Sequence, residues 1–250
     1  MYSEHRQHPI LWLSTDNREE GDRPNSINRA AWANSPATRR RFRMSNLSLA
    51  VGRPTIADRV LPRSLATDLV LVATGAALVA AAAQLYVPMW PVPISGQTFA
   101  VLLVGTALGA SRGALSMVLY ALLGLVGLPV YTDGSSGLAV LGGTTGGYIV
   151  GFVAAAAVSG WLAQRAWDRR VLGTLATFAA GTVTIYAFGL PWLAVTLGAM
   201  GVPDVLGTTI SGGLLPFVVG DALKALLAAG LLPFAWKALG RSDRRSGAAE

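Results

Sequence analysis

Long apolar segments separated by very few charges dominate residues 68–236. Between Asp68 and Trp236 the sequence holds only nine charged residues: Arg112, Asp133, Arg165, Asp168, Arg169, Arg170, Asp204, Asp221 and Lys224. Charged residues make up 13% of the whole chain, about half the share of a soluble domain. A helix needs about 20 apolar residues to cross the hydrocarbon core of a bilayer. The chain is therefore expected to be an all-α integral membrane protein.

Six segments are candidates for membrane-spanning helices. They cover Leu69–Tyr86, Thr98–Ala110, Gly113–Leu128, Gly146–Leu162, Val171–Leu190 and Leu214–Trp236. Basic residues test this count, because Lys and Arg gather in cytoplasmic connections. With six spans, the connections 87–97, 129–145 and 191–213 contain neither Lys nor Arg, whereas all other basic segments fall on the opposite side. The pattern predicts a six-helix bundle in the cell membrane with cytoplasmic termini and three long outer loops.

Residues 1–60 differ from the rest of the chain. They hold ten of the twenty basic residues and six of the thirteen acidic ones, without apolar periodicity. Such a composition does not bury enough apolar surface to fold alone, and it lacks the features of a secretory signal. We expect a disordered cytoplasmic extension over 1–60, a membrane domain over 61–240 and a cytoplasmic tail over 241–250. Met1 and Met44 both stay open as the physiological start.

Several classes of chemistry are excluded by residues that are missing. The chain has no cysteine, and its two histidines, His5 and His8, lie in the polar extension, so neither a metal site nor histidine acid–base chemistry is expected in the membrane. Its two lysines, Lys224 and Lys237, do not follow a phosphate-binding loop, and no hydrolase motif occurs. We expect neither an enzyme nor a resident cofactor. Membrane topology explains the net charge of +7 better than nucleic-acid binding.

Asp221 and Lys224 are the strongest candidate for a functional site, because they lie one helical turn apart inside the last apolar segment. A charge at bilayer depth costs at least about 2.5 kcal/mol, so it persists mainly beside a cavity or a partner. One interpretation is a structural ion pair between the two side chains. The other, which we favour, is a clamp for a polar ligand, in which the carboxylate accepts hydrogen bonds and the ammonium donates them.

The outer connections hold further candidates. Ser95, Gln97 and Thr98 stand at the entrance to the second span, where they either cap the helix or bind a ligand. Glycines over 137–147 allow the backbone to pass close to a ligand and to present bare amides, with Tyr148 as a pocket wall. Interfacial belts account for Trp90, Tyr131, Tyr186 and Trp192. Asp133 is expected in a turn and Arg112 as a topology charge.

Alanines form a smooth stripe on the first span. Ala73, Ala76, Ala77, Ala80 and Ala81 lie at helical spacing, and small side chains allow another helix to approach closely. The stripe serves either packing within the bundle or docking of another membrane subunit.

Several segments together resemble the BioY family, the biotin-binding membrane subunits of energy-coupling factor (ECF) transporters. The likeness runs from about Leu65 to Trp236. Its pieces are Pro91–Leu103, Gly113–Ser116, Tyr120–Gly124, Gly127–Val130, Gly137–Leu141, Gly146–Tyr148 and Gly220-Asp221 with Lys224. The family commonly reads Gly-Pro-Thr-Gly-Gly-Tyr where this chain has Thr144 in place of the proline, so the rigidity of this loop is expected to differ.

The resemblance implies a six-helix subunit that captures biotin under its outer loops and delivers it for uptake. It implies that the glycine loop (Gly137, Ala139, Gly146, Gly147 and Tyr148), Gln97, Asp221 and Lys224 hold the ligand. Which of Asp221 and Lys224 meets the ureido group is left open. It also implies that the alanine stripe docks on a transmembrane coupling subunit, which connects to ABC-type ATPase subunits.

Two other functions are compatible with the residues. A self-sufficient carrier of biotin or a related small carboxylic acid would use Asp221 to couple transport to protons, although the sequence has no clear inverted repeat. A membrane scaffold would bind no solute. Another vitamin of similar shape is also a candidate ligand.

Overall fold

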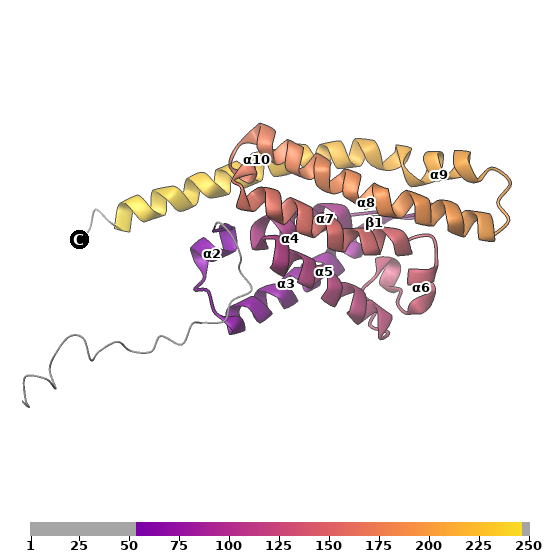
Figure 1. Ribbon diagram of the computed structural model, residues 1–250, viewed down its shortest axis with the longest axis horizontal. Helices are drawn as coiled ribbons and strands as arrows, with labels where there is room; N and C mark the ends of the chain where they lie inside the picture. Colours follow the sequence, from indigo (N-terminus) through magenta and orange to yellow (C-terminus); the bar gives the residue numbers. More distant parts are fainter. Residues whose placement is uncertain (1–53, 247–250) are drawn as a thin grey trace, which may run out of the picture. The chain divides into compact units, whose positions relative to one another are not determined.

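The computed structural model of the chain describes residues 54–246, with side chains as far as residue 240. Both candidate start residues and most of the expected N-terminal extension lie outside this range. The described helices are α2 (Ile56–Val60), α3 (Leu65–Ala83), α4 (Gln97–Leu108), α5 (Ala110–Leu125), α6 (Leu138–Gly142), α7 (Gly146–Gln164), α8 (Val171–Ala199), α9 (Val205–Gly213) and α10 (Leu215–Ser246). Short 3₁₀ turns cover Thr132–Gly134 and Trp167–Arg169, and an antiparallel hairpin pairs β1 (Tyr86–Val87) with β2 (Ile94–Ser95). Figure 1 shows α2 near one end of the helical bundle and α6 near the other.

Four stretches are long and apolar enough to cross a membrane: α3, α7, α8 and the combined α9–α10 segment Val205–Gly240. Helices α4 and α5 are shorter apolar helices of 12 and 16 residues. The predicted class, a helical membrane protein, is thereby confirmed. At 1.5 Å per residue, α4 reaches only about 18 Å, well short of the hydrocarbon thickness.

Helix α8 corrects the expected end of the fifth span. It continues past Leu190 and through Pro191 to Ala199, so the connection to α9 consists of residues 200–204 rather than 191–213. A proline removes one helical hydrogen bond, but a helix in lipid and protein has no water with which to replace the others. The helix therefore continues through the proline, and the third outer loop is short.

Helices α4 and α7 form the centre of the bundle. Of the most apolar window of α7, 67% is buried, against 22% for α3 and 28% for α8. Small residues permit this close packing: a Cβ added to Gly105 of α4 would lie 2.2 Å from the hydroxyl of Ser159 on α7. Between α4 and α5 the chain reverses at Gly109, whose φ of +88° strongly favours glycine. A short α4 thus fits because protein, rather than lipid, surrounds it.

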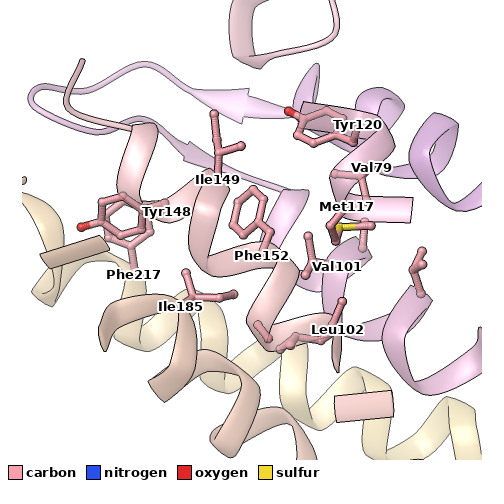
Figure 2. Close-up of a cluster of buried hydrophobic side chains, with 14 of the residues drawn as sticks. Val79, Val101, Leu102, Met117, Tyr120, Tyr148, Ile149, Phe152, Ile185 and Phe217 are labelled. Atoms are coloured by element: carbon pink, nitrogen blue, oxygen red, sulfur yellow. The ribbon is translucent and has the colours of Figure 1, made fainter. Parts of the chain in front are cut away.

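The hydrophobic core follows the inner face of α7. Figure 2 shows Phe152 in the middle of the cluster, with Tyr148 and Phe217 on one side and Met117 and Tyr120 on the other. All five side chains are buried. Because Tyr148, Ile149 and Phe152 stand near the start of α7, this aromatic layer also forms one wall of the cavity described below.

A sealed charge cluster ties α2, α3 and α5 together. The guanidinium of Arg112 lies 2.7 Å from Asp58 and 2.5 Å from Asp68, and the three side chains are 1%, 3% and 0% exposed. The interpretation of Arg112 as a topology charge is therefore wrong: the residue is inside helix α5 and buried, because two carboxylates neutralise it. Part of the segment expected to be disordered, residues 56–60, forms α2 through this contact.

The hydrogen-bond partners of Asp58 determine the pKa of its carboxyl group. Burial alone would raise the pKa of its carboxyl group. Hydrogen bonds from the Arg63 side chain, the Thr55 backbone and Arg112 outweigh that effect and lower the pKa to about 2. Asp58 is thus a carboxylate over the whole physiological pH range.

Candidate ligand-binding site

A cavity of about 440 Å³ lies at the end of the bundle that carries α6. Its walls come from the β1–β2 hairpin, the segment 131–149 and residues of α7, α8 and α10. Val92, Ile149, Phe152 and Phe217 form apolar parts of the wall. Its polar side chains are Tyr86, Ser95, Gln97, Thr98, Tyr131, Thr132, Asp133, Ser135, Thr144, Thr145, Tyr148 and Tyr186. Pockets for small molecules typically have volumes of about 300–1,000 Å³ and apolar walls with a few polar groups. The cavity therefore has the size and lining of a small-molecule site.

Asp221 and Lys224 lie directly behind one wall of this cavity. Their side chains form an ion pair with 3.1 Å between Nζ and Oδ1, and they are 7% and 18% exposed. Nζ also donates to the hydroxyl of Thr98 at 2.7 Å and to the Ser95 carbonyl at 3.1 Å. The Thr98 hydroxyl donates to Asp221 at 3.2 Å, and the Tyr186 hydroxyl donates to the other carboxylate oxygen.

The ligand clamp expected of Asp221 and Lys224 stays a prediction. Asp221 and Lys224 do not belong to the cavity wall, whereas their partners Ser95, Thr98 and Tyr186 do. A ligand that displaced the Thr98 or the Tyr186 hydroxyl would meet a charged group immediately beneath it. The two side chains thus bind each other and the hydroxyls of Thr98 and Tyr186 next to the cavity.

Gln97 lies on the cavity wall and organises a second polar cluster. Its amide nitrogen donates to the Tyr120 hydroxyl. Its amide oxygen accepts from the Ser95 hydroxyl at 2.9 Å and from the Thr132 hydroxyl at 3.1 Å. Since Ser95 also contacts Lys224 through its carbonyl, the two clusters meet at this residue. Gln97 does not cap α4, whose N-cap is Gly96 without a side-chain hydrogen bond; instead it joins the hairpin to the loop after α5.

Two loops cover the cavity and are fastened to each other by polar contacts. The Thr144 hydroxyl donates to the Pro91 carbonyl at 2.7 Å, and the Tyr86 hydroxyl donates to the Asp133 carboxylate at 2.6 Å. The second bond raises the pKa of Tyr86. Asp133 has the positive φ of 60° expected of a turn residue. These contacts form a cover that joins parts of the chain about 50 residues apart.

Three glycines of the glycine-rich segment have backbone amides that are already hydrogen-bonded within the protein. The amides of Gly137, Gly143 and Gly146 donate to the carbonyls of Gly124, Val140 and Gly143. The expectation of free amides is therefore wrong for these glycines, because the segment folds into α6 and the first turn of α7. Ala139 lines the cavity, whereas Gly137, Gly146 and Gly147 are not among its lining residues.

Gly146 and Gly147 have a packing role. A Cβ on Gly146 would lie 1.7 Å from the Leu141 carbonyl oxygen, and one on Gly147 would lie 2.2 Å from Trp192. Only glycine allows α6 and α8 to approach α7 this closely. The two residues thereby fix the position of Tyr148, which lines the cavity, donates to the Gly213 carbonyl at 3.0 Å and stacks on Phe217.

Two aromatic residues expected in an interfacial belt belong to the site instead. Tyr186 lines the cavity and holds Asp221. Tyr131 is 1% exposed, lines the cavity and donates to the Ala121 carbonyl at 2.7 Å. The expected end of the fifth span at Leu190 placed Tyr186 near an interface. Because α8 continues to Ala199, Tyr186 lies in the middle of the helix, away from the interfaces where belt residues occur.

The alanine stripe on α3 divides between two faces. Ala76 is 1% exposed and packs in the core, and Ala80 is half-buried beside it. Ala73, Ala77 and Ala81 are exposed. The structure therefore assigns Ala76 to packing within the bundle and leaves the other three on an outer face.

Comparison with known proteins decides the family. A profile of the BioY family matches residues 52–241, more than half of the chain. The chain belongs to the BioY family. The resemblance drawn from its motifs is thereby confirmed.

Individual relatives agree. The chain is 37% identical over 173 residues to "Biotin transporter BioY" of Rhizobium etli, an alignment covering 65% of this chain and 89% of that protein. It is 39% identical over 157 residues to "Biotin transporter BioY" of Thermotoga maritima, covering 61% and 86%. The fold is similar, with a TM-score of 0.59, to a crystal structure of the S-component for biotin from an ECF-type ABC transporter, at 26% identity and covering 69% of this chain and 92% of that one.

Proposed function

We propose that this chain captures biotin in the outer cavity and serves as the substrate-specific membrane subunit of an ECF-type transporter. The observation that carries the proposal is the cavity of about 440 Å³ beside the Asp221–Lys224 cluster, in a chain that belongs to the BioY family. Relatives named as biotin transporters and the biotin S-component with a similar fold support the choice of ligand.

The polar and apolar groups of biotin match the polar and apolar residues of the cavity wall. Its ureido group has two N–H donors and a carbonyl acceptor, its tail ends in a carboxylate, and its bicyclic ring is otherwise apolar. Ser95, Thr98 and Tyr186, with Asp221 and Lys224 behind them, offer acceptors and donors to one polar end. Ile149, Phe152 and Phe217 offer apolar surface to the ring. Gln97, Ala139 and Tyr148 complete the walls, and Gly137, Gly146 and Gly147 hold the cover in shape.

A six-span topology suits this function. Helices α3, α4, α5, α7, α8 and the α9–α10 segment would be the six, with α4 buried among the others. Arg165, Arg169, Arg170 and Lys237 all lie at the end away from the cavity, which the positive-inside rule assigns to the cytoplasm. The cavity would then open outward, and both termini would be cytoplasmic.

Partner subunits would supply the energy. No phosphate-binding loop occurs in the sequence, so ATP hydrolysis would belong to ABC-type ATPase subunits, linked through a transmembrane coupling subunit. The exposed face of Ala73, Ala77 and Ala81 on α3 is the candidate contact with that subunit. In this scheme the chain is a transport subunit without a catalytic centre, a resident cofactor or a nucleic-acid partner.

Titration of biotin against the detergent-purified chain tests the binding proposal. We expect saturable one-to-one binding that an equal excess of an unrelated cyclic carboxylic acid does not displace. Absence of binding by folded protein would contradict the proposal. Biotin uptake into cells with and without coupling subunits then separates the ECF scheme, which requires them, from a self-sufficient carrier, whose uptake a protonophore abolishes.

A further inference from the structure

A basic hollow lies at the end of the bundle opposite the cavity. It has a volume of about 800 Å³, and its lining includes Arg165, Arg169, Arg170, Trp167 and the first turn of α8. Helix α7 connects the two ends, because it begins at the cavity near Tyr148 and ends immediately before Arg165. The hollow is therefore a separate feature at the predicted cytoplasmic surface.

Within the described residues 54–240, none of the three arginines forms a salt bridge, and the one carboxylate that acts on them electrostatically is Asp168, through Arg169. Asp168, between them in sequence, is fully buried, and one of its carboxylate oxygens accepts a hydrogen bond from the Trp236 indole at 2.6 Å. Two of the guanidinium groups rest on indole rings instead: Arg165 lies 3.6 Å from the Trp161 ring centre and Arg169 lies 4.2 Å from that of Trp236. Stacking occupies the face of a guanidinium and leaves its N–H edges available to an anion.

The start of α8 adds to the positive potential of the hollow. No side chain caps this helix terminus, so its first amides contribute partial positive charge next to Arg170. The same turn is strongly apolar on its outside, with Leu172 80% exposed and Val171 54% exposed. Trp167, 45% exposed, has the position of an aromatic residue at a membrane interface.

We propose that this hollow binds the headgroup of an anionic diacyl phospholipid. The arginine N–H groups would bind the phosphate oxygens in bidentate fashion, while the acyl chains would run along Leu172 and Val171 into the bilayer. Basic pockets on the cytoplasmic side of membrane helices are suited to such headgroups. Soluble phosphate would use the arginines alone and leave the apolar rim exposed to water, so the lipid is the better match to both parts of the surface.

The test follows thermal unfolding of the full-length protein in dodecyl maltoside micelles during titration with dioleoyl phosphatidylglycerol. The wild-type midpoint should rise, whereas dioleoyl phosphatidylcholine and soluble glycerol phosphate should not raise it. A variant with Arg165→Gln, Arg169→Gln and Arg170→Gln should require roughly 100-fold more phosphatidylglycerol for the same effect. The matched control Lys237→Gln, which removes a cation from the same end but outside this hollow, should behave like wild type.

A second variant, with lysine at all three positions, separates a built site from general attraction. It keeps the charge but loses the bidentate N–H groups and the stacking on tryptophan, so its response should be at least several-fold weaker than that of wild type. An undiminished response of the lysine or the glutamine variant would overturn the proposal. A full response of wild type to glycerol phosphate would overturn the assignment to a lipid.

Discussion

The described residues contain a charge cluster at each end of the bundle, and the surroundings of the two clusters differ. At one end, Arg112 is sealed between Asp58 and Asp68, all at 3% exposure or less. At the other end, Asp221 and Lys224 bond to hydroxyls that line a cavity. The first cluster joins three helices and leaves no space for a guest. The hydroxyl partners of the second cluster line a cavity, so a bound ligand would reach them.

This difference shows that a buried charge does not by itself indicate a binding site. Replacing a buried ion pair by apolar residues of similar size is often neutral, but removing one partner leaves an unpaired charge and is strongly destabilising. Removing one partner from the sealed cluster should therefore lower the free energy of unfolding. Removing one partner from the cluster beside the cavity should lower mainly the affinity for the ligand.

The largest effect is expected for Arg112→Ala, which leaves two buried carboxylates facing each other. Stability should fall by about 3–5 kcal/mol, measured by thermal or denaturant unfolding in detergent. Arg112→Lys, which keeps the charge, is the matched control and should lose less. If Arg112→Ala lowered biotin affinity while unfolding at the wild-type midpoint, the assignment of the two clusters to different roles would be wrong.

Asp221→Asn should weaken biotin binding by about 10- to 100-fold. The substitution removes the negative charge that Lys224 faces and leaves only one of the two side-chain oxygens that accept from Thr98 and Tyr186, and equilibrium titration measures the loss. Asp204→Asn is the matched control, since Asp204 caps α9 and asparagine caps equally well. Equal affinity of both variants would refute a role of the Asp221 cluster in binding.

Acid should destabilise the sealed cluster through Asp58. Its pKa in the folded protein is about 2, below the ordinary value of 3.8, so the unfolded chain binds more protons between these values. The stabilisation is complete above about pH 4 and decreases as pH falls toward 2. Arg63→Gln removes one of the hydrogen bonds that lower the pKa and should flatten this dependence in unfolding measurements. An unchanged slope in that variant would show that Arg63 does not control the titration.

The smallest effect is expected at the cover of the cavity. Tyr86→Phe removes the hydrogen bond to Asp133, and loss of an accessible hydrogen bond costs about 0.5–1 kcal/mol. Release of radiolabelled biotin should become roughly 2- to 5-fold faster, while Trp90→Phe, on an exposed side chain of the same loop, should leave the rate unchanged. Equal rates in both variants would show that this contact does not retain the ligand.

The sequence predicted the helical membrane class and the family, because these depend on local composition and spacing. It singled out Asp221 and Lys224 but favoured a ligand clamp over the ion pair that the structure shows. It did not predict the buried position of Arg112, since its two carboxylates come from segments more than 40 residues away. The extension of α8 past Pro191 was missed because a proline ends a helix in water more often than in a membrane. The sequence also did not predict that Tyr131 and Tyr186 line the cavity. The position of Tyr186 depends on where α8 ends, and that of Tyr131 depends on tertiary packing.

A structure determined with biotin bound would show directly whether the cavity is the binding site. We expect biotin in the cavity between Phe152 and the β1–β2 hairpin, with one polar end within hydrogen-bonding distance of the Thr98, Tyr186, Asp221 and Lys224 group. Biotin bound elsewhere on the protein, with this cavity empty, would contradict this expectation.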